Sequence, residues 1–282
     1  MKETELKIKD HLDSLYAKYG KSYLETDPVA FVHRFSAKDD IEIVGFLCAL
    51  LAFGNVPQIK RSLEDLLSRL GDCPAVFVRN FRMEQRVVFA GFRHRFVGED
   101  QMTALVRVVG KLLRERGSIK NAFTDCYSPG DLTSSLSRFI EKMKRAAGER
   151  GKLLKFILPD PKAGSACKRL FLFLRWMVRR DDGVDFGIFD TVSPAELIIP
   201  LDTHIARISN LFGFTKKKSK SLSTAIEITE RLKRYDPQDP VKYDFALTRI
   251  GIVEGCLGVY SQSVCFLCEA GLLCKMLRTE SD

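Results

Sequence analysis

The feature that most limits the possible folds is the stretch from Ile41 to Phe53, which is apolar at almost every position. A helix that is apolar on all sides has to be buried in a protein core or in a membrane. Its nearly uncharged part, Ile43 to Phe53, is only about half as long as a membrane-spanning helix. We therefore expect a core helix, which ends at the turn Gly54-Asn55-Val56-Pro57.

Most other apolar residues also recur at helical spacing. Further helices are predicted up to about Tyr23, from Asp27 onward, and at Gln58 to Leu70, Pro74 to Phe81, Arg86 to Phe92, Gln101 to Arg116 and Leu132 to Arg145. No stretch shows sustained alternation of period two, so no sheet of consequence is expected. The predicted fold class is all-α.

The length and composition favour a soluble protein. A chain of 282 residues with 45% hydrophobic residues can bury a full core and is long enough for two lobes. The mixed-charge start from Met1 to Lys7 does not have the pattern of a secretion signal, so we expect a cytoplasmic protein. In a reducing cytosol the eight cysteines are expected as thiols or metal ligands, with Cys48, Cys73 and Cys126 as ordinary thiols.

The net charge of +9 is concentrated in one segment. From Arg138 to Arg180 there are thirteen Lys or Arg against three acids, a local excess of 13 − 3 = +10. A smaller cluster spans Lys216 to Lys220. Such concentration indicates a phosphate-rich polyanion as partner, and the alternative is a solvated basic helix face.

Asp202 precedes a helical pattern formed by Ile205, Ile208 and Leu211. Its position predicts a helix N-cap, in which the carboxylate accepts amide hydrogens of the first turn. A carboxylate at the positive end of a helix is expected to stay ionised near neutral pH. It suits a base or a group that stabilises developing positive charge, and the alternative is that it only caps the helix.

Lys168 lies at the start of another predicted helix, Ser165 to Arg180, which follows a turn that contains Pro159 and Pro161. Arg175 and Arg179 fall close to the same line of that helix as Lys168. Neighbouring cations and a helix N-terminus disfavour an ammonium ion, as an amine nucleophile requires. The alternative is that Lys168 contacts only phosphate or solvent.

Four cysteines near the C-terminus, Cys256, Cys265, Cys268 and Cys274, have the spacing C-x8-C-x2-C-x5-C. This pattern is typical of a metal site with four thiolate ligands, and it accommodates either an iron–sulfur cluster or zinc. The alternative is a helix with buried cysteines, since the intervening residues are largely apolar.

These stretches together resemble a known family. Asp202-Thr203-His204-Ile205-x-Arg207-Ile208 is similar to the Asp-Thr-His-Ile/Val-x-Arg-Val segment of endonuclease III and its relatives, the helix-hairpin-helix DNA glycosylase superfamily. Gly164-Ser165-Ala166-Cys167-Lys168 resembles the hairpin Gly-Val-Gly-Arg-Lys of that family, and the four cysteines resemble its cluster loop. The combination looks like a little-characterised bacterial subgroup of the superfamily.

The resemblance implies a two-lobed helical bundle, with one lobe over residues 28–200 and another over residues 1–27 plus 201–282. It implies a DNA base-excision repair glycosylase with Schiff-base lyase activity, in which Lys168 and Asp202 are catalytic. It also implies a [4Fe-4S] cluster on the four cysteines, with zinc as the alternative, and a monomer that binds double-stranded DNA. The DNA-binding residues would be Gly164, Ser165, Ala166, Arg169, Arg175, Arg179, Asn55, Lys216, Lys217 and Lys218.

Three departures from the family pattern leave other interpretations open. An acidic and apolar insert, Asp181 to Leu197, separates Lys168 from Asp202, and it either lines the substrate pocket or is a surface excursion. Ala166 replaces the second hairpin glycine, and Asn55 stands near the position of a gap-filling glutamine. The alternatives are a non-catalytic nucleic-acid-binding protein on the same scaffold and a zinc-stabilised helical interaction protein.

Overall fold

The computed structural model describes residues 3–259 and 262–274. The chain divides into two compact units. Unit 1 comprises the described residues of 1–24, 164–186 and 193–282, and unit 2 comprises residues 25–163 and 187–192. The sequence predicts a boundary at residue 200, whereas the structure joins the turn at 164–167 and its following helix to the C-terminal helices. Lys168 and Asp202 consequently lie in the same unit.

Unit 2 is helical apart from one short hairpin. Its elements are α2 (Val29–Val32), α3 (Lys38–Leu51), α4 (Val56–Leu70), α5 (Pro74–Asn80), η2 (Met83–Phe89), β1 (Arg93–His94), β2 (Val97–Gly98), α6 (Glu99–Arg116), α7 (Ile119–Thr124), α8 (Leu132–Ala146), η3 (Gly148–Leu154) and η4 (Pro161–Ala163). Here η denotes a 3₁₀ helix. The prediction of a mostly helical protein is confirmed.

Helix α3 forms the core of unit 2, as its uniform apolarity predicts. Every residue from Ile41 to Leu51 is buried. The one acidic residue among them, Glu42, accepts hydrogen bonds from the backbone N–H groups of Ile119 and Lys120, at 2.9 and 2.7 Å. Burial raises the pKa of the Glu42 carboxyl, and the two N–H donors oppose that rise. A single acid in the core helix thus caps the first turn of α7.

The short hairpin is the element that the sequence does not predict. Strands β1 and β2 pair antiparallel, with Arg93 opposite Gly98 and His94 opposite Val97. The predicted helix from Arg86 to Phe92 is instead the 3₁₀ segment η2 followed by a turn. Two residues per strand are too few to produce a readable alternation.

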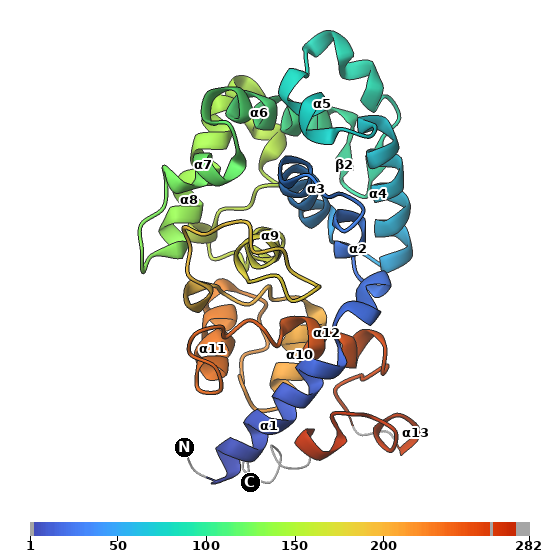
Figure 1. Cartoon of the computed structure of the whole chain (residues 1–282), viewed down its shortest axis with the longest axis vertical. Helices are drawn as coiled ribbons and strands as arrows, with labels where there is room; N and C mark the ends of the chain where they lie inside the picture. The colour runs from blue at the N-terminus through green and yellow to red at the C-terminus, as the bar shows by residue number, and fades with distance from the viewer. Residues whose placement is uncertain (1–2, 260–261, 275–282) are drawn as a thin grey trace. The chain divides into compact units, whose positions relative to one another are not determined.

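Unit 1 consists of the N-terminal helix and most of the described chain after residue 163 (Figure 1). Its elements are α1 (Glu3–Lys18), most of η1 (Lys21–Thr26), α9 (Lys168–Val178), η5 (Pro194–Glu196), α10 (Thr203–Leu211), α11 (Leu222–Lys233), α12 (Asp244–Ile252) and α13 (Gln262–Cys265). Helix α1 lies beside α12, and Tyr243 Oη donates a 2.8 Å hydrogen bond to Asp13. The N-terminal helix thereby packs on the segment that precedes the four cysteines.

Among the described residues, no helix combines the length and apolar character that a membrane crossing needs.

Candidate functional site

Lys168 and Asp202 are brought together at the N-termini of two helices. Lys168 is the first residue of α9, and Asp202 is the N-cap of α10. Asp202 Oδ1 accepts a 2.8 Å hydrogen bond from the Ile205 backbone N–H, while Oδ2 lies 3.8 Å from Lys168 Nζ. The two side chains are 28% and 21% exposed. The carboxylate therefore caps its helix with one oxygen and faces the lysine with the other, and both groups remain open to a ligand.

The turn before α9 is held by the segment that enters α11. Gly164 has a φ of +77° and its carbonyl accepts a 3.1 Å hydrogen bond from Leu222 N–H, while Ser165 forms an antiparallel bridge with Ser221. The unusual backbone conformation later in the turn falls at Cys167, with a φ of +44°, and not at Ala166. Ala166 is buried within the turn.

The N-termini of α9, α10 and α11 are thus connected to one another. Lys220 belongs to the basic cluster before α11, and its Nζ lies 3.2 Å from Thr203 Oγ1 at the start of α10. Each helix N-terminus carries partial positive charge. Together with Lys168 and Lys220, this end of unit 1 is suited to an anion.

An open depression of about 550 Å³ adjoins this end of unit 1. It is lined by Thr203, Ala206, Arg207, Asn210, Leu211, Lys218, Lys220, Leu257 and Gly258. Arg207 and Lys220 are not among the residues that the sequence predicts to bind DNA, although Lys220 lies in the basic cluster and Arg207 in the Asp-Thr-His motif. Burial leaves Arg207 Nε without a hydrogen-bond partner among the described residues. The depression is basic, and it opens beside the residue that follows Asp202.

His204, two residues after Asp202, is a neutral structural group. Its Nδ1 lies 3.2 Å from a guanidinium nitrogen of Arg207, which can only donate, so Nδ1 is the acceptor and the proton resides on Nε2. Burial lowers the pKa of His204, and the cations Arg207, Lys168 and Arg249 lower it further against the opposite effect of Asp202. A Cβ at Gly251 would lie 2.4 Å from Nδ1, so only glycine leaves room for this ring.

Arg175 and Arg179 are predicted to bind DNA, and this prediction is wrong. They are 2% and 1% exposed, and both pair with acids inside unit 1. Arg175 contacts Asp185 at 3.1 Å and also contacts Asp244, while Arg179 contacts Asp182 at 3.0 Å, Asp239 at 2.9 Å and also Asp185. Guanidinium groups in such a network are unavailable to phosphate.

The insert Asp181 to Leu197 supplies two of those acids. Burial would raise the pKa of Asp182, but the Arg179 guanidinium and the hydrogen bonds from Asp185 N–H, Tyr16 Oη and Val184 N–H outweigh it and lower the pKa to about 2. Asp185 is fully buried, and burial raises its pKa against the attraction of Arg175 and Arg179. The start of the insert is therefore an internal brace for α9, and neither a pocket lining nor a surface excursion.

The other predicted DNA-binding residues occupy varied positions. Lys216 and Lys218 are exposed, whereas Lys217 pairs with Glu227 at 2.9 Å. Burial lowers the pKa of Arg169, which follows Lys168 on α9, to about 10, so it is still a cation at neutral pH. Asn55 lies in unit 2, where its side chain caps α4 by accepting a 2.9 Å hydrogen bond from Gln58 N–H. Whether these residues contact DNA stays a prediction.

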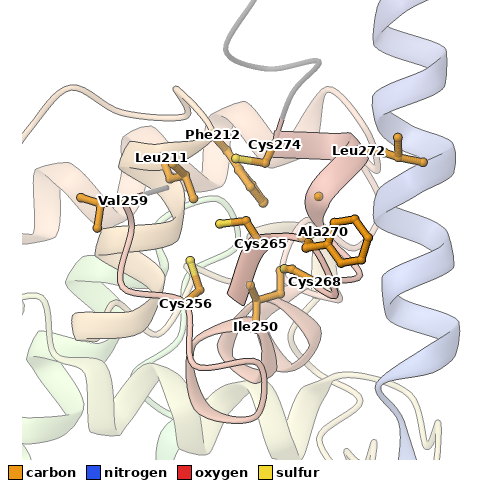
Figure 2. A pocket seen from close by; sticks show the side chains of 12 residues that line it. Leu211, Phe212, Ile250, Cys256, Val259, Cys265, Cys268, Ala270, Leu272 and Cys274 are labelled. Carbon is orange, nitrogen blue, oxygen red and sulfur yellow. The ribbon is translucent and has the colours of Figure 1, made fainter. Parts of the chain in front are cut away.

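The four cysteines line a common cavity of about 330 Å³. Figure 2 shows their side chains around one space, together with Ile250, Phe212 and other apolar residues. The cavity is roughly ten times the volume of one water molecule in the liquid. An apolar pocket with four thiols as its chemically reactive groups is suited to a soft metal.

Four thiols are a donor set for either a multinuclear cluster or a single zinc ion. Thiolates on one tetrahedral zinc lie about 3.8 Å apart, because each Zn–S bond is ~2.3 Å. In the described part of the chain, no group of three or more His, Cys, Asp or Glu side chains is arranged to hold a metal ion as it stands. An iron–sulfur cluster gives each thiolate its own iron and so needs a wider ring of sulfur atoms. Whether the four cysteines hold an iron–sulfur cluster or zinc stays a prediction.

Comparison with protein families matches residues 27–253 to the family described as "Protein of unknown function (DUF2400)". The matched region contains Lys168 and Asp202, and it ends before Cys256. No curated protein and no solved structure matches the chain.

Proposed function

Because the chain belongs to the DUF2400 family of proteins of unknown function, membership assigns no activity, and we propose from the site itself that the protein is a DNA base-excision repair glycosylase with Schiff-base lyase activity. The observation that carries the proposal is the Lys168–Asp202 pair, held 3.8 Å apart at two helix N-termini. An amine nucleophile beside a carboxylate base, both open to a ligand, is the arrangement that covalent catalysis requires.

Asp202 has two tasks in the proposed reaction. Its free oxygen Oδ2 accepts a proton from Lys168 Nζ and leaves a neutral amine. Asp202 then passes that proton to the departing base, and the carboxylate so regenerated stabilises the positive charge that develops on the sugar. The hydrogen bond from Ile205 N–H fixes the orientation of the carboxylate throughout.

Lys168 forms the covalent bond. Its neutral Nζ attacks the anomeric carbon C1′ of a nucleotide whose base has been flipped out of the duplex. The N–C1′ bond forms, the glycosidic bond breaks, and the base leaves with the electron pair and takes up a proton. Opening of the sugar ring gives an imine between Nζ and C1′, and loss of the C2′ proton then expels the 3′ phosphate and cleaves the strand.

The basic groups around the pair fit a DNA backbone. Arg207, Lys218 and Lys220 line the depression that begins at Thr203, next to Asp202. The positive ends of the α10 and α11 helix dipoles add to the attraction for phosphate. This distribution supports a polyanionic substrate whose sugar lies at Lys168.

The four cysteines would hold an iron–sulfur cluster. Cys256 follows α12, and Cys265 is the last residue of α13, so four sulfur–iron bonds would tie the C-terminal segment to the rest of unit 1. When bound, such a cluster supplies structural cross-links and a redox-active centre. The loop before Cys265 also contributes Leu257 and Gly258 to the basic depression, so its shape affects that surface.

Borohydride trapping tests the lysine directly. The full-length protein is incubated with labelled duplexes that carry uracil, an oxidised pyrimidine or an abasic site, and borohydride reduces any imine to a stable adduct seen on a denaturing gel. We expect an adduct with the wild type, none with Lys168→Ala, and an unchanged yield with Lys162→Ala, which removes an exposed lysine six residues earlier.

The failed outcomes separate the alternatives. Base release without any adduct on these duplexes would retain the glycosylase and exclude the Schiff base. Neither base release nor an adduct, together with salt-dependent binding that is indifferent to lesions and to Asp202→Asn, would overturn the proposal in favour of a non-catalytic nucleic-acid-binding protein.

A further inference from the structure

A ladder of aromatic rings in unit 2 runs from the core to the surface. His94 is fully buried, with Nδ1 2.9 Å from Ser62 Oγ and Nε2 3.0 Å from the Phe53 carbonyl. Its ring contacts Phe53 edge to face, with centroids 4.6 Å apart. Phe53 contacts Phe156 at 5.3 Å, and Phe156 contacts Phe96 at 5.6 Å, again edge to face. We name Phe53, Phe156 and Phe96 the aromatic ladder.

The outer end of the ladder is exposed although it is rigidly supported. Phe156 is 45% exposed and Phe96 is 68% exposed. Phe96 and Arg95 form the two-residue loop of the β1–β2 hairpin. The hydrogen bonds of His94 with Ser62 and with the Phe53 carbonyl attach that hairpin to the neighbouring segments. A large apolar ring exposed on a preorganised support has little conformational freedom left to lose when a planar ligand covers it.

The backbone conformation of Arg95 at the hairpin tip places Phe96 at the surface. Arg95 has a φ of +53°, a conformation that an arginine rarely adopts. Its side chain lies against Gly54, where a Cβ would come within 3.1 Å of Arg95 Cδ. The arginine also lies over the Phe96 ring, 5.6 Å from its centroid. The glycine and the strained arginine together hold the tip next to the turn that carries Phe53.

The segments that supply the rings of the ladder carry basic residues. The three segments that supply its rings, residues 51–58, 92–98 and 150–158, contain no Asp or Glu. They contribute exposed Arg93, Arg95 and Lys155. Among the described residues, no ion pair with an acid involves any of these three cations. These three cations differ from Arg175 and Arg179 of unit 1, whose charges are neutralised by buried ion pairs.

From these observations we infer that the aromatic ladder binds single-stranded nucleic acid, with an unpaired base stacked on Phe96 and backbone phosphates held by Arg93, Arg95 and Lys155. A base has a flat apolar face and a flanking negative charge, which match an exposed aromatic ring beside unpaired cations. Stacking does not depend on the identity of the base, so the surface is expected to tolerate many sequences. The inference goes beyond the proposed base excision and holds even if borohydride trapping fails.

Two oligomers of equal charge separate stacking from electrostatics. The full-length protein is titrated into fluorescent dT20 and into a 20-unit oligomer of the same backbone that has abasic spacers in place of bases. We expect tighter binding of dT20. Phe96→Ala should weaken binding of dT20 about 5- to 150-fold, the loss of one stacked base, and leave the abasic oligomer unaffected. Phe96→Trp should retain binding.

Matched controls distinguish stacking from general effects. Val87→Ala removes another exposed apolar side chain of unit 2, 71% exposed, and should change neither affinity. Arg93→Gln should reduce the slope of log K against log salt concentration by about 0.7, the value for one phosphate contact on a single strand. Phe96→Ala should leave that slope as it is.

Four outcomes would overturn the inference. They are no measurable binding of dT20, equal binding of both oligomers by the wild type, an equal loss on both oligomers for Phe96→Ala, and a loss that occurs only on fully paired duplex. The last outcome would indicate insertion between stacked pairs in place of stacking on an unpaired base.

Discussion

Replacing Arg179 by glutamine distinguishes a structural arginine from a DNA-binding one. In the structure, the Arg179 guanidinium contacts Asp182, Asp185 and Asp239 inside unit 1. With Arg175 and Asp244 the network has two cations and four carboxylates, a formal charge of 2 − 4 = −2. The substitution makes it −3 and leaves fully buried Asp185 with one cation in place of two.

The expected cost follows from that burial. Removing one partner of a buried ion pair costs about 3–5 kcal/mol, because the remaining charge is left uncompensated. At about 2–4 °C per kcal/mol for a chain of this size, the unfolding temperature should fall by at least roughly 6 °C. Arg180→Gln is the matched control, because Arg180 is the next residue and is exposed, and it should change stability by no more than about 0.5 kcal/mol.

Tryptophan fluorescence reports this unfolding locally. The chain has one tryptophan, and Trp176 is fully buried on α9 between Arg175 and Arg179. Urea titrations followed by its emission therefore measure the stability of unit 1. If Arg179→Gln and Arg180→Gln unfold at the same urea concentration while only the former loses affinity for DNA, Arg179 binds DNA and does not stabilise unit 1.

The pH dependence of the Arg179→Gln effect is a second check on the same network. Asp182 has a folded pKa of about 2 against an ordinary value of 3.8, so its contribution to stability is present above pH 3.8 and is lost as the pH falls through about 2. The raised pKa of Asp185 has the opposite effect on stability. Its ionised carboxylate destabilises the folded state, and protonation at low pH removes that destabilisation. Arg179 favours the ionised form of both carboxylates, so its loss matters most when both are ionised. The destabilisation by Arg179→Gln should therefore be largest at neutral pH and smaller below about pH 4.

Two further predictions concern the proposed active site and the cysteine cavity. Asp202→Asn should keep the hydrogen bond from Ile205 N–H and the stability of the protein, but lose the trapped adduct. Asp202→Ala should lose the adduct and also about 0.5–2 kcal/mol of stability. An Asp202→Asn variant that still forms the adduct would show that the carboxylate is only a cap. Protein purified without air should contain iron and absorb visible light, and Cys265→Ser should lose both while Cys126→Ser, in unit 2, keeps them. Colourless protein that contains zinc would instead favour the zinc alternative.

Local signals are what the sequence conveys well. The core helix α3 is predicted because its apolarity does not depend on any partner, and the cap at Asp202 because the N-cap acts within one turn. The hairpin at residues 93–98 is missed because two-residue strands carry no periodicity. Its aromatic partners, Phe53 and Phe156, come from segments about forty and sixty residues away, so no local pattern reveals the ladder.

Charge is where the sequence misleads. The excess of +10 from Arg138 to Arg180 includes Arg175 and Arg179, and both are neutralised by acids that lie after position 180. A count of charges within one segment does not reveal ion pairs with acids that lie outside that segment. The cations that remain exposed near Asp202 are instead Lys218 and Lys220, together with partly buried Arg207.

The ion pairs at the start of the insert also help to fix the long connection between the two proposed catalytic residues. Lys168 and Asp202 are 202 − 168 = 34 residues apart, and a long flexible connection would leave their separation undefined. Asp182 and Asp185 instead fasten the beginning of the insert to the C-terminal end of α9, while Ile199 N–H, near its end, donates a 3.0 Å hydrogen bond to Thr229 on α11. Both ends of the connection are therefore anchored within unit 1. We expect these anchors to limit variation in the separation of Lys168 and Asp202, a property that catalysis by the pair would require.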